Sequence, residues 1–471
     1  MKIGSSVGFQ LIDIFRIIED PNLTIDKKKE KVSEYQKNLQ SIEHGLRVGG
    51  NTGQNNKNGF YVFGNIDEMD YESLARVKEY VDKTLSSLTC EGEMKMGAIL
   101  GYDKEKHILK YNFSFADKIY SYAREKGKDV RGHTLVWHKH EPEALDQYIS
   151  DHLGMPMEKY AQEHPEVFYQ RRKELTKQFL SEYIKTMGEH FPDCYAWDVL
   201  NEIVPDVQFE QCTEQEKAEG LRHSKWREYL GEDFFIEVLQ IARDNLPEGT
   251  KLFYNEYGEQ NPEKRKAILA VIEKIKQYEA RTGNIILDGI GLQSHYDLNM
   301  TPEQIEEIYH EFASTEKEIQ ITEADITPGM KSMEEYKEYD PQNKQYGILW
   351  TKMMECAEKY GVAAFTAWGV CDDLSWHRDI GCTMIDKKGF PKAFAIDFLN
   401  KNKPKAETQG KDGREDCLRD KNTTISGVQK AIKDTHANIL GNDINTNEKN
   451  RIGEEWLTKE KLKLWLKFCI I

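Results

Sequence analysis

Short apolar segments alternate with longer, charged segments about eight times between the N-terminus and about residue 400. The short segments are rich in β-branched and aromatic residues, which is typical of strands, and the long ones have the apolar spacing of helices. This alternation indicates parallel β/α units, and eight such units favour a closed (β/α)8 TIM barrel. An open doubly wound sheet is disfavoured because no Gly-x-Gly-x-x-Gly follows the first strand.

The pattern gives approximate bounds for each element. The expected strands are residues 2–7, 88–96, 130–138, 195–200, 251–256, 285–296, 318–326 and 362–370. The expected helices are residues 71–87, 111–127, 166–190, 232–245, 262–281, 302–313, 341–360 and 391–400. We therefore expect an α/β chain whose first strand is followed by a long insertion and whose barrel is followed by a C-terminal tail.

Several expected strands end in polar or aromatic residues. These residues are Glu91, His133, Glu202, Asn255, Gln293, Glu323 and Trp368. Because the carboxyl ends of all strands in a parallel barrel open on one face, we expect these side chains to gather there. That face is the predicted position of a functional site.

Three segments lie outside the barrel pattern. The insertion after the first strand contains a Lys/Glu-rich segment with helical spacing at about 20–46, followed by a Gly/Asn-rich loop at 49–59. Residues 401–453 have few aliphatic side chains and are expected to be a linker or a disordered segment. Residues 454–471 regain an amphipathic pattern, which fits a short helix docked on the barrel, free in solvent, or lying on a membrane surface. The predicted organisation is thus a barrel at 1–400, a linker and a short helix.

Composition limits the partners of the chain. A formal charge of −16 at pH 7 disfavours nucleic acid and anionic membranes. The eight cysteines show no Cys-x-x-Cys spacing and the histidines are scattered, so we expect free thiols and no metal site. No apolar run has the length of a membrane span, and no signal peptide is visible. We expect a monomer that is cytoplasmic as written, or secreted if an upstream signal is missing.

Two glutamates follow the ends of different expected strands. Glu202 stands beside an amide, Asn201, just after a buried apolar strand, which is how barrel enzymes present a general acid. Glu323 ends the seventh strand. Glycoside hydrolysis needs one carboxyl group that protonates the leaving oxygen and a second, ionised one that attacks the anomeric carbon. Either glutamate by itself could merely cap a strand and be solvated, but the pair predicts this chemistry.

Five segments resemble motifs of glycoside hydrolase family 10, the endo-β-1,4-xylanases, in order and in strand placement. They are Gly132–His138 (GHTLVWH), Trp197–Glu202 (WDVLNE), Gly289–His295 (GIGLQSH), Ile321–Asp325 (ITEAD) and Trp368–Trp376 (WGVCDDLSW). The resemblance covers roughly residues 2–400. It implies retaining, endo-acting hydrolysis of β-1,4-xylosidic bonds in xylan or xylo-oligosaccharides by double displacement, with no cofactor.

The resemblance also implies roles for the matched residues. Glu202 would be the acid/base and Glu323 the nucleophile, with carboxyl groups roughly 5–5.5 Å apart. Burial and the like charge of Glu323 are expected to raise the pKa of Glu202. Asn201 matches the amide that binds the 2-hydroxyl of the sugar being cleaved. His295 matches the residue that orients the nucleophile, and Asp325 would hold that histidine.

Sugar binding follows from residue type, because indole rings stack on the C–H faces of pyranoses and polar side chains bind the hydroxyls. The residues that match the family's sugar-binding positions are Glu91, Lys95, His133, Trp137, Gln293, Trp368 and Trp376. For each tryptophan, packing in the core is the alternative role. For His295, the alternative is a core histidine bonded to the backbone.

One motif departs from the family pattern. Where the family has Glu-Asn-x-Met-Lys-Trp, this chain has Glu91-Gly-Glu-Met-Lys-Met96. Gly92 removes an amide and Met96 removes an indole on the glycone side, the side of the sugar that is attacked. We expect weaker or reshaped glycone subsites that favour short or decorated oligosaccharides.

Two other functions stay open from the sequence. The same fold could hydrolyse another β-linked glycan or a glycoside, since a fold does not fix its substrate. The barrel could also bind glycans without cleaving them. The four residues Glu202, Glu323, Asn201 and His295 argue against a binding protein, because binding alone does not need two converging acids.

Overall fold

The computed structural model describes most of the barrel region. The described residues are 1–48, 66–206, 213, 216, 220–329, 344–377, 381–402 and 404. The chain divides into two units, Met1–Lys403 and Pro404–Ile471. The expected loop at 49–59, nearly all of the linker at 401–453 and the helix at 454–471 lie outside the described residues, so these assignments stay predictions.

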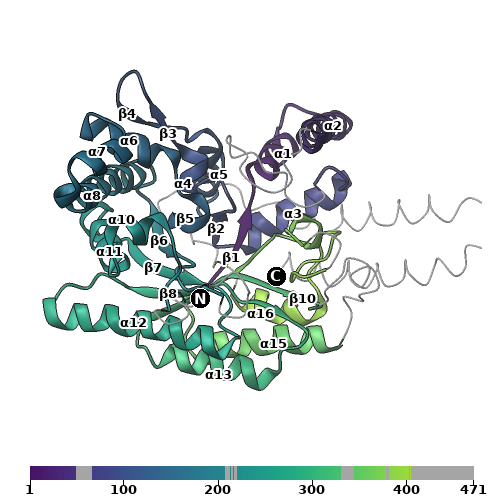
Figure 1. The fold of residues 1–471 in the computed structure, drawn as a ribbon. Helices are drawn as coiled ribbons and strands as arrows, with labels where there is room; N and C mark the ends of the chain where they lie inside the picture. Colours follow the sequence, from purple (N-terminus) through teal and green to yellow (C-terminus); the bar gives the residue numbers. More distant parts are fainter. Residues whose placement is uncertain are drawn as a thin grey trace, which may run out of the picture. The chain divides into compact units, whose positions relative to one another are not determined.

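Within the described residues, eight parallel strands form a closed barrel (Figure 1). In order around the barrel, they are β1 (Lys2–Val7), β2 (Ser87–Cys90), β5 (Asp129–Trp137), β6 (Cys194–Asn201), β7 (Lys251–Glu256), β8 (Gly289–Leu292), β10 (Glu318–Thr327) and β11 (Ala364–Ala367). Strand β11 pairs with β1 on one side and with β10 on the other, which closes the sheet. The predicted TIM barrel is confirmed.

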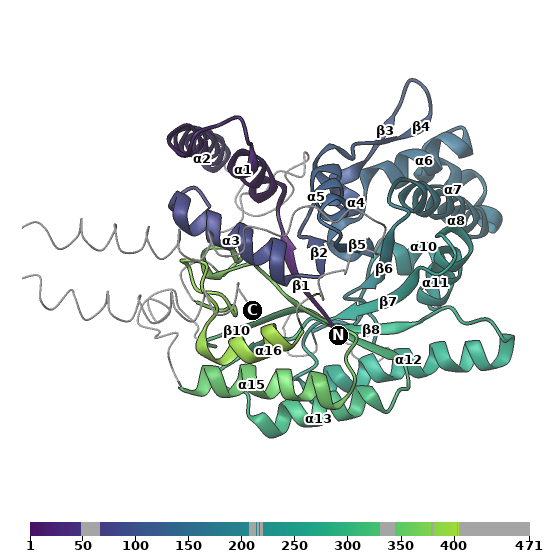
Figure 2. The same ribbon diagram turned by 180° about the vertical axis from the view of Figure 1, so that it is seen from behind.

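Helices pack around the outside of the barrel, as the two opposite views in Figures 1 and 2 show. The helices that follow successive strands are α3 (Tyr71–Thr84), α5 (Ser114–Glu125), α8 (Pro165–His190), α11 (Phe234–Asn245), α12 (Pro262–Thr282), α13 (Pro302–Ala313), α15 (Lys344–Lys359) and α16 (Ile396–Lys401). Helix α13 shows how the sequence sets a boundary. Thr301 and Gln304 form a capping box and Pro302 occupies the first turn, a combination that favours a helix start.

The connections carry further elements. They are the helices α1 (Phe9–Glu19), α2 (Ile25–Val48), α4 (Met96–Ile99), α6 (Glu143–Leu153), α7 (Met157–Glu163) and α10 (Lys225–Leu230), the hairpin of β3 (Leu100–Asp103) and β4 (Ile108–Tyr111), the strand β9 (His295–Asp297), and the 3₁₀ helices η1 (His138–His140), η2 (Asp372–Leu374) and η3 (Ala393–Ala395). The helical spacing of residues 20–46 predicts α2, and the expected strand at 285–296 covers most of β9, whereas the sequence did not predict the others. Among the described residues, no helix is long and apolar enough to cross a bilayer. Helices α1 and α2 lie in the expected insertion after β1.

Three strands end at least three residues earlier than expected. The predicted strand at 362–370 is β11, which stops at Ala367. The predicted strand at 88–96 stops at Cys90. The predicted strand at 285–296 is divided, because β8 stops at Leu292 and β9 begins at His295. Between them Ser294 has a φ of 57°, a value that is rare for residues other than glycine. Its N–H and its hydroxyl both bond to Oε1 of buried Glu259, at 3.0 and 3.1 Å, and these bonds stabilise the break.

A buried ion pair spans the barrel interior. Arg131 on β5 and Asp198 on β6 have side chains that are each 1% exposed. The Nε of Arg131 donates to Oδ2 of Asp198 at 3.1 Å, and its two terminal nitrogens donate to Oδ1 of Asp198 and to Gln320 on β10. His133 Nδ1 lies 2.9 Å from the same Oδ2. Burial raises the pKa of Asp198, but Arg131 and His133 outweigh it and lower the pKa.

Replacing Arg131 by Met leaves the Asp198 carboxylate buried without its main partner. We expect the free energy of unfolding in urea to fall by about 3–5 kcal/mol. Adding Asp198→Asn to this variant removes the uncompensated charge and should recover part of the loss. As a control, Lys159→Met breaks the exposed ion pair with Glu163 and should cost no more than about 1 kcal/mol. Equal losses in the two single variants would contradict this account of the interior.

Candidate active site

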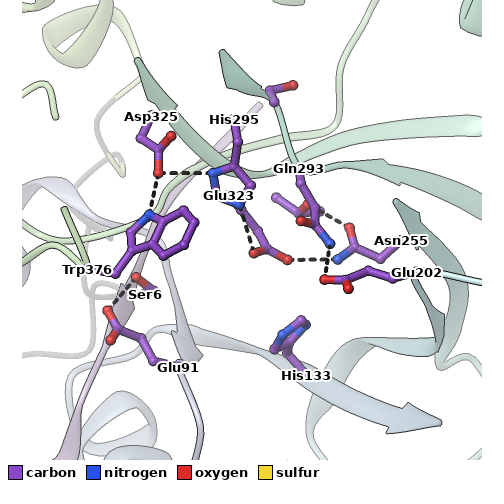
Figure 3. Close-up of polar contacts among 12 residues, drawn as sticks. Ser6, Glu91, His133, Glu202, Asn255, Gln293, His295, Glu323, Asp325 and Trp376 are labelled. Carbon is purple, nitrogen blue, oxygen red and sulfur yellow. Dashed lines mark hydrogen bonds and ion pairs between the residues drawn. The ribbon is translucent and has the colours of Figure 1, made fainter. Parts of the chain in front are cut away.

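The two predicted acidic residues lie at the same mouth of the barrel and are joined through amide side chains (Figure 3). Glu202 and Glu323 are each 6% exposed. Asn255, at the end of β7, donates to Oε1 of Glu323 at 2.8 Å and to Oδ1 of Asn201 at 2.9 Å. Gln293 Nε2 donates to Oε1 of Glu202 at 3.3 Å and to the same Asn201 oxygen at 3.4 Å. The strand ends thus bring together residues that are distant in sequence.

A histidine fixes the second oxygen of Glu323. Nε2 of His295 lies 3.3 Å from Oε2 of Glu323, and its Nδ1 lies 2.9 Å from Oδ2 of Asp325. Trp376 Nε1 donates to that Asp325 oxygen at 2.7 Å. Burial lowers the pKa of His295, but the charges of Asp325 and Glu323 outweigh it and raise the pKa well above its usual value. Both nitrogens of His295 thus face a carboxylate oxygen, an arrangement that favours the protonated imidazole.

The expected raised pKa of Glu202 is wrong. Burial does raise it, but the ammonium group of Lys139 lowers it, with smaller contributions from His138, the Trp137 indole and Gln293, and the pKa falls to about 2. Nζ of Lys139 lies 3.3 Å from Oε2 of Glu202. Glu202 is therefore ionised in the free protein. The expectation failed because it considered only burial and Glu323.

Glu91, at the end of β2, also has a buried carboxyl group, but its protonation state is the opposite of that of Glu202. Ser6 donates to its Oε1 at 2.7 Å, while its Oε2 has no hydrogen-bond partner among the described residues. Burial raises the pKa of Glu91 to about 8, helped by the charges of Glu93 and Glu323 and opposed by Ser6 and Lys95. The group is protonated at neutral pH. It can both donate to and accept from a sugar hydroxyl.

The predicted aromatic residues differ in exposure. Nζ of Lys95 lies over the rings of Trp137 and Trp368, at 4.7 and 5.9 Å from their centroids. Trp368 is only 7% exposed and meets the His133 ring edge-on at 5.5 Å. Trp376 is 51% exposed, so of the three tryptophans it offers the most surface for stacking on a sugar.

Sequence reasoning missed two residues of this mouth. Asn255 was recognised as a strand end but not as a partner of Glu323, although an Asn-Glu pair ends that strand as it does at Glu202. Lys139 gave no signal, because a lysine in a polar loop is usually solvated. Among the described residues, no group of three or more His, Cys, Asp or Glu is arranged to hold a metal ion.

One departure from the family motif, Gly92, directly follows Glu91, and the other, Met96, lies at the start of the next helix. The buried Gly92 donates its backbone N–H to Oε2 of Glu93 at 3.1 Å. Met96 begins helix α4 and is 1% exposed, so its side chain packs in the interior. At neither position, therefore, does a large side chain face the solvent.

A parallel barrel with two buried glutamates at the ends of its strands, linked by amides and backed by a histidine, defines the class of glycoside hydrolases. Residues 53–402 match the sequence profile of glycosyl hydrolase family 10. The chain belongs to this family and is a glycoside hydrolase.

The similar proteins found by sequence and by structure support the same family. The chain is 33% identical over 305 residues to endo-1,4-beta-xylanase A of Thermotoga maritima, which covers 63% of this chain and 25% of that protein. It is 30% identical over 313 residues to the beta-1,4-xylanase of Dictyoglomus thermophilum, covering 65% and 75%. A solved endo-1,4-beta-xylanase from Caldicellulosiruptor owensensis has a TM-score of 0.56 at 26% identity, covering 69% and 92%. The chain thus spans about a quarter of the length of the Thermotoga relative.

The protonated state of Glu91 predicts a pH-dependent stability. Its pKa is about 8 in the folded chain and about 4.5 without the fold. The wild type therefore loses stability, relative to a Glu91→Gln variant, as pH rises from 4.5 to 8, because only the unfolded chain ionises there. We expect the variant's advantage in free energy of unfolding to grow by on the order of 4 kcal/mol over this range.

Thermal and urea unfolding at pH 4.5, 6 and 8 would measure this difference. Glu125→Gln is the control, because Arg16 lowers the pKa of that exposed carboxyl. A lowered pKa contributes stability that is present above the unfolded pKa and lost at acid pH. The control should therefore be less stable than the wild type at neutral pH. A difference for Glu91→Gln that does not change with pH would contradict the assignment.

Proposed function

We propose that the chain is an endo-acting, retaining hydrolase of β-1,4-xylosidic bonds in xylan or xylo-oligosaccharides. The observation that carries this proposal is the network from Glu202 through Gln293, Asn201 and Asn255 to Glu323. It holds two carboxyl groups at one mouth in fixed orientations, as double displacement requires. The substrate is inferred from the relatives, which are named as xylanases.

In the first step, an oxygen of Glu323 would attack the anomeric carbon. Because Glu202 is ionised in the free protein, it must first take up a proton from solvent. The bond to the leaving sugar then breaks, and the leaving oxygen takes that proton. The product is a glycosyl ester on Glu323. His295 and Asn255 hold the attacking carboxylate in place. The Oδ1 of Asn201 accepts from two amides, which orients its NH₂ group as a donor for the 2-hydroxyl of the sugar.

In the second step, the Glu202 carboxylate would take a proton from a water molecule whose oxygen attacks the anomeric carbon. The bond to Glu323 breaks and its carboxylate is restored. Two inversions return the sugar to its starting β configuration. The step needs an ionised Glu202, and the lowered pKa of this group in the free protein supports that requirement.

The different roles of the two glutamates predict different losses of activity when each is replaced. Glu323→Ala removes the nucleophile and should lower kcat on an aryl β-xyloside by at least about 10⁴-fold. Glu202→Ala should lower kcat/KM on unsubstituted xylo-oligosaccharides by about 10²–10⁴-fold. It should affect glycosylation by a dinitrophenyl β-xyloside much less, because that leaving group needs no proton. Azide should then restore turnover of Glu202→Ala and give a β-configured glycosyl azide.

Steady-state kinetics and NMR of the first-formed anomer would measure these effects. The control is Glu303→Ala, which replaces an exposed residue of α13. It should change neither the rate constants nor the configuration of the first-formed product. An α-configured first product would rule out retention, and an active Glu323→Ala would rule out the nucleophile. Parallel assays on aryl xyloside, cellobioside and glucoside would separate a xylanase from a same-fold enzyme for another β-glycan. A glycan-binding protein would cleave none of them.

The glycine at position 92 predicts a preference for short substrates. Gly92→Asn would restore an amide beside Glu91 and should raise kcat/KM on xylohexaose relative to xylobiose by about tenfold, the worth of one or two added hydrogen bonds. Gly154→Asn is the control, because Gly154 is the left-handed C-cap of α6 with open space around it. An unchanged ratio in Gly92→Asn would exclude this glycine as the cause of any chain-length preference.

A further inference from the structure

An exposed lysine is paired with the buried acid/base residue. Nζ of Lys139 lies 3.3 Å from Oε2 of Glu202. The other oxygen of Glu202, Oε1, accepts from Gln293. The lysine side chain is 55% exposed and the glutamate side chain 8%, so the ion pair is open to solvent on the side of the lysine. The two oxygens of Glu202 thus have different surroundings.

This pairing opposes the first step of the proposed reaction. Glu202 must carry a proton when the glycosidic bond breaks, but an ammonium group 3.3 Å away stabilises the carboxylate. Lys139 must therefore leave Glu202 before the bond is cleaved. Apart from Glu202, the contact of Nζ within the described residues is with the ring of Trp137, 5.0 Å from its centroid. Little else holds the lysine where it is.

The other titratable or charged groups around Glu202 come from several elements. They are His138 and His140 of η1, Lys95 before α4, Glu256 of β7, Tyr257, Arg222 before α10, and Glu323 of β10. Burial lowers the pKa of His138 to about 4 and that of His140 to about 3, so neither carries a positive charge at neutral pH.

The remaining cations differ from Lys139 in their partners and in their exposure. Nε of Arg222 donates to the backbone oxygen of Glu202 and its Nη2 to that of Val204, both at 3.1 Å. Lys95 lies over the same Trp137 ring as Lys139 but also over Trp368, and its side chain is less exposed. Lys139 is therefore the cation near Glu202, within the described part of the chain, that is both exposed and able to exchange its partner.

We propose that Lys139 binds a carboxylate of the substrate, so that the enzyme prefers xylo-oligosaccharides bearing a uronic acid branch close to the bond that is cleaved. The proposal rests on the xylanase function proposed above. A substrate carboxylate would replace Glu202 as the partner of the ammonium group. Glu202 would then be free to take up the proton that it donates. A neutral substrate offers no such partner. Lys139 then stays beside Glu202 and competes with the proton for its carboxylate.

The charge of the surroundings supports one position for such a branch. The chain carries a formal charge of −16, and the carboxyl group of Glu323 lies at the same mouth. This charge repels an acidic sugar, whereas the ammonium group of Lys139 attracts it within a few ångströms, a range over which salt screens little. The uronic acid is therefore directed to the side of Glu202 that faces Lys139.

The test compares two xylo-oligosaccharides of equal backbone length, one neutral and one with a single uronic acid branch, at pH 6–7 and low salt. For the wild type, we expect kcat/KM on the acidic substrate to exceed that on the neutral one by at least about tenfold, as for one charge-assisted hydrogen bond. Lys139→Met should remove this preference and Lys139→Arg should keep most of it. Lys159→Met removes the same charge from helix α7 and should leave the preference unchanged.

The pH profile of kcat/KM on the neutral substrate provides a second readout. In Lys139→Met the pKa of Glu202 is no longer lowered by the ammonium group, so the basic limb should move to higher pH. If that limb moves but the preference for the acidic substrate is absent or unaltered, Lys139 only tunes Glu202 and the proposal is overturned. If the wild type cleaves neither substrate, the xylanase function fails as well. Cleavage of both with equal kcat/KM refutes the inference alone.

Discussion

Closure of the sheet is the constraint on which the rest of the structure depends. Strand β11 pairs with both β1 and β10, so the carboxyl ends of all eight strands meet around one mouth. This geometry brings Glu202 to the amide of Gln293 and Glu323 to that of Asn255, and both amides donate to Asn201. The Arg131–Asp198 pair links the inner faces of the barrel below that mouth. The relative positions of the functional side chains therefore depend on closure of the sheet.

Within this frame, neighbours decide the state of each buried carboxyl group. Glu91 and Glu202 are both buried at strand ends, yet the pKa of Glu91 is raised to about 8 and that of Glu202 is lowered to about 2. Burial acts in the same direction on both. The difference comes from Lys139, whose ammonium group approaches Glu202, while the nearest acids around Glu91 add to the effect of burial. One residue type thus provides a neutral group and an ionised one.

The sequence was sufficient to predict the barrel, the mouth and most of its residues, because these depend on local periodicity and on strand ends. Asn201, Glu202 and Glu323 follow directly from that pattern. The break at Ser294 was not predictable, because it is stabilised by Glu259, which lies on another connection. The prediction for the pKa of Glu202 failed for the same reason. It depends on an exposed lysine that only the folded chain brings to 3.3 Å.

In the double displacement proposed above, the Lys139–Glu202 pair would have opposite effects on the two steps. In the first step, it would stabilise the carboxylate and so oppose proton donation. In the second step, Glu202 must act as a base, and the same ammonium group would keep it ionised until water has attacked. A leaving sugar that carries a carboxylate would remove Lys139 for the first step and release it on departure. The lysine would then return to Glu202 when the base is needed, which couples the identity of the leaving group to the proton state of one residue.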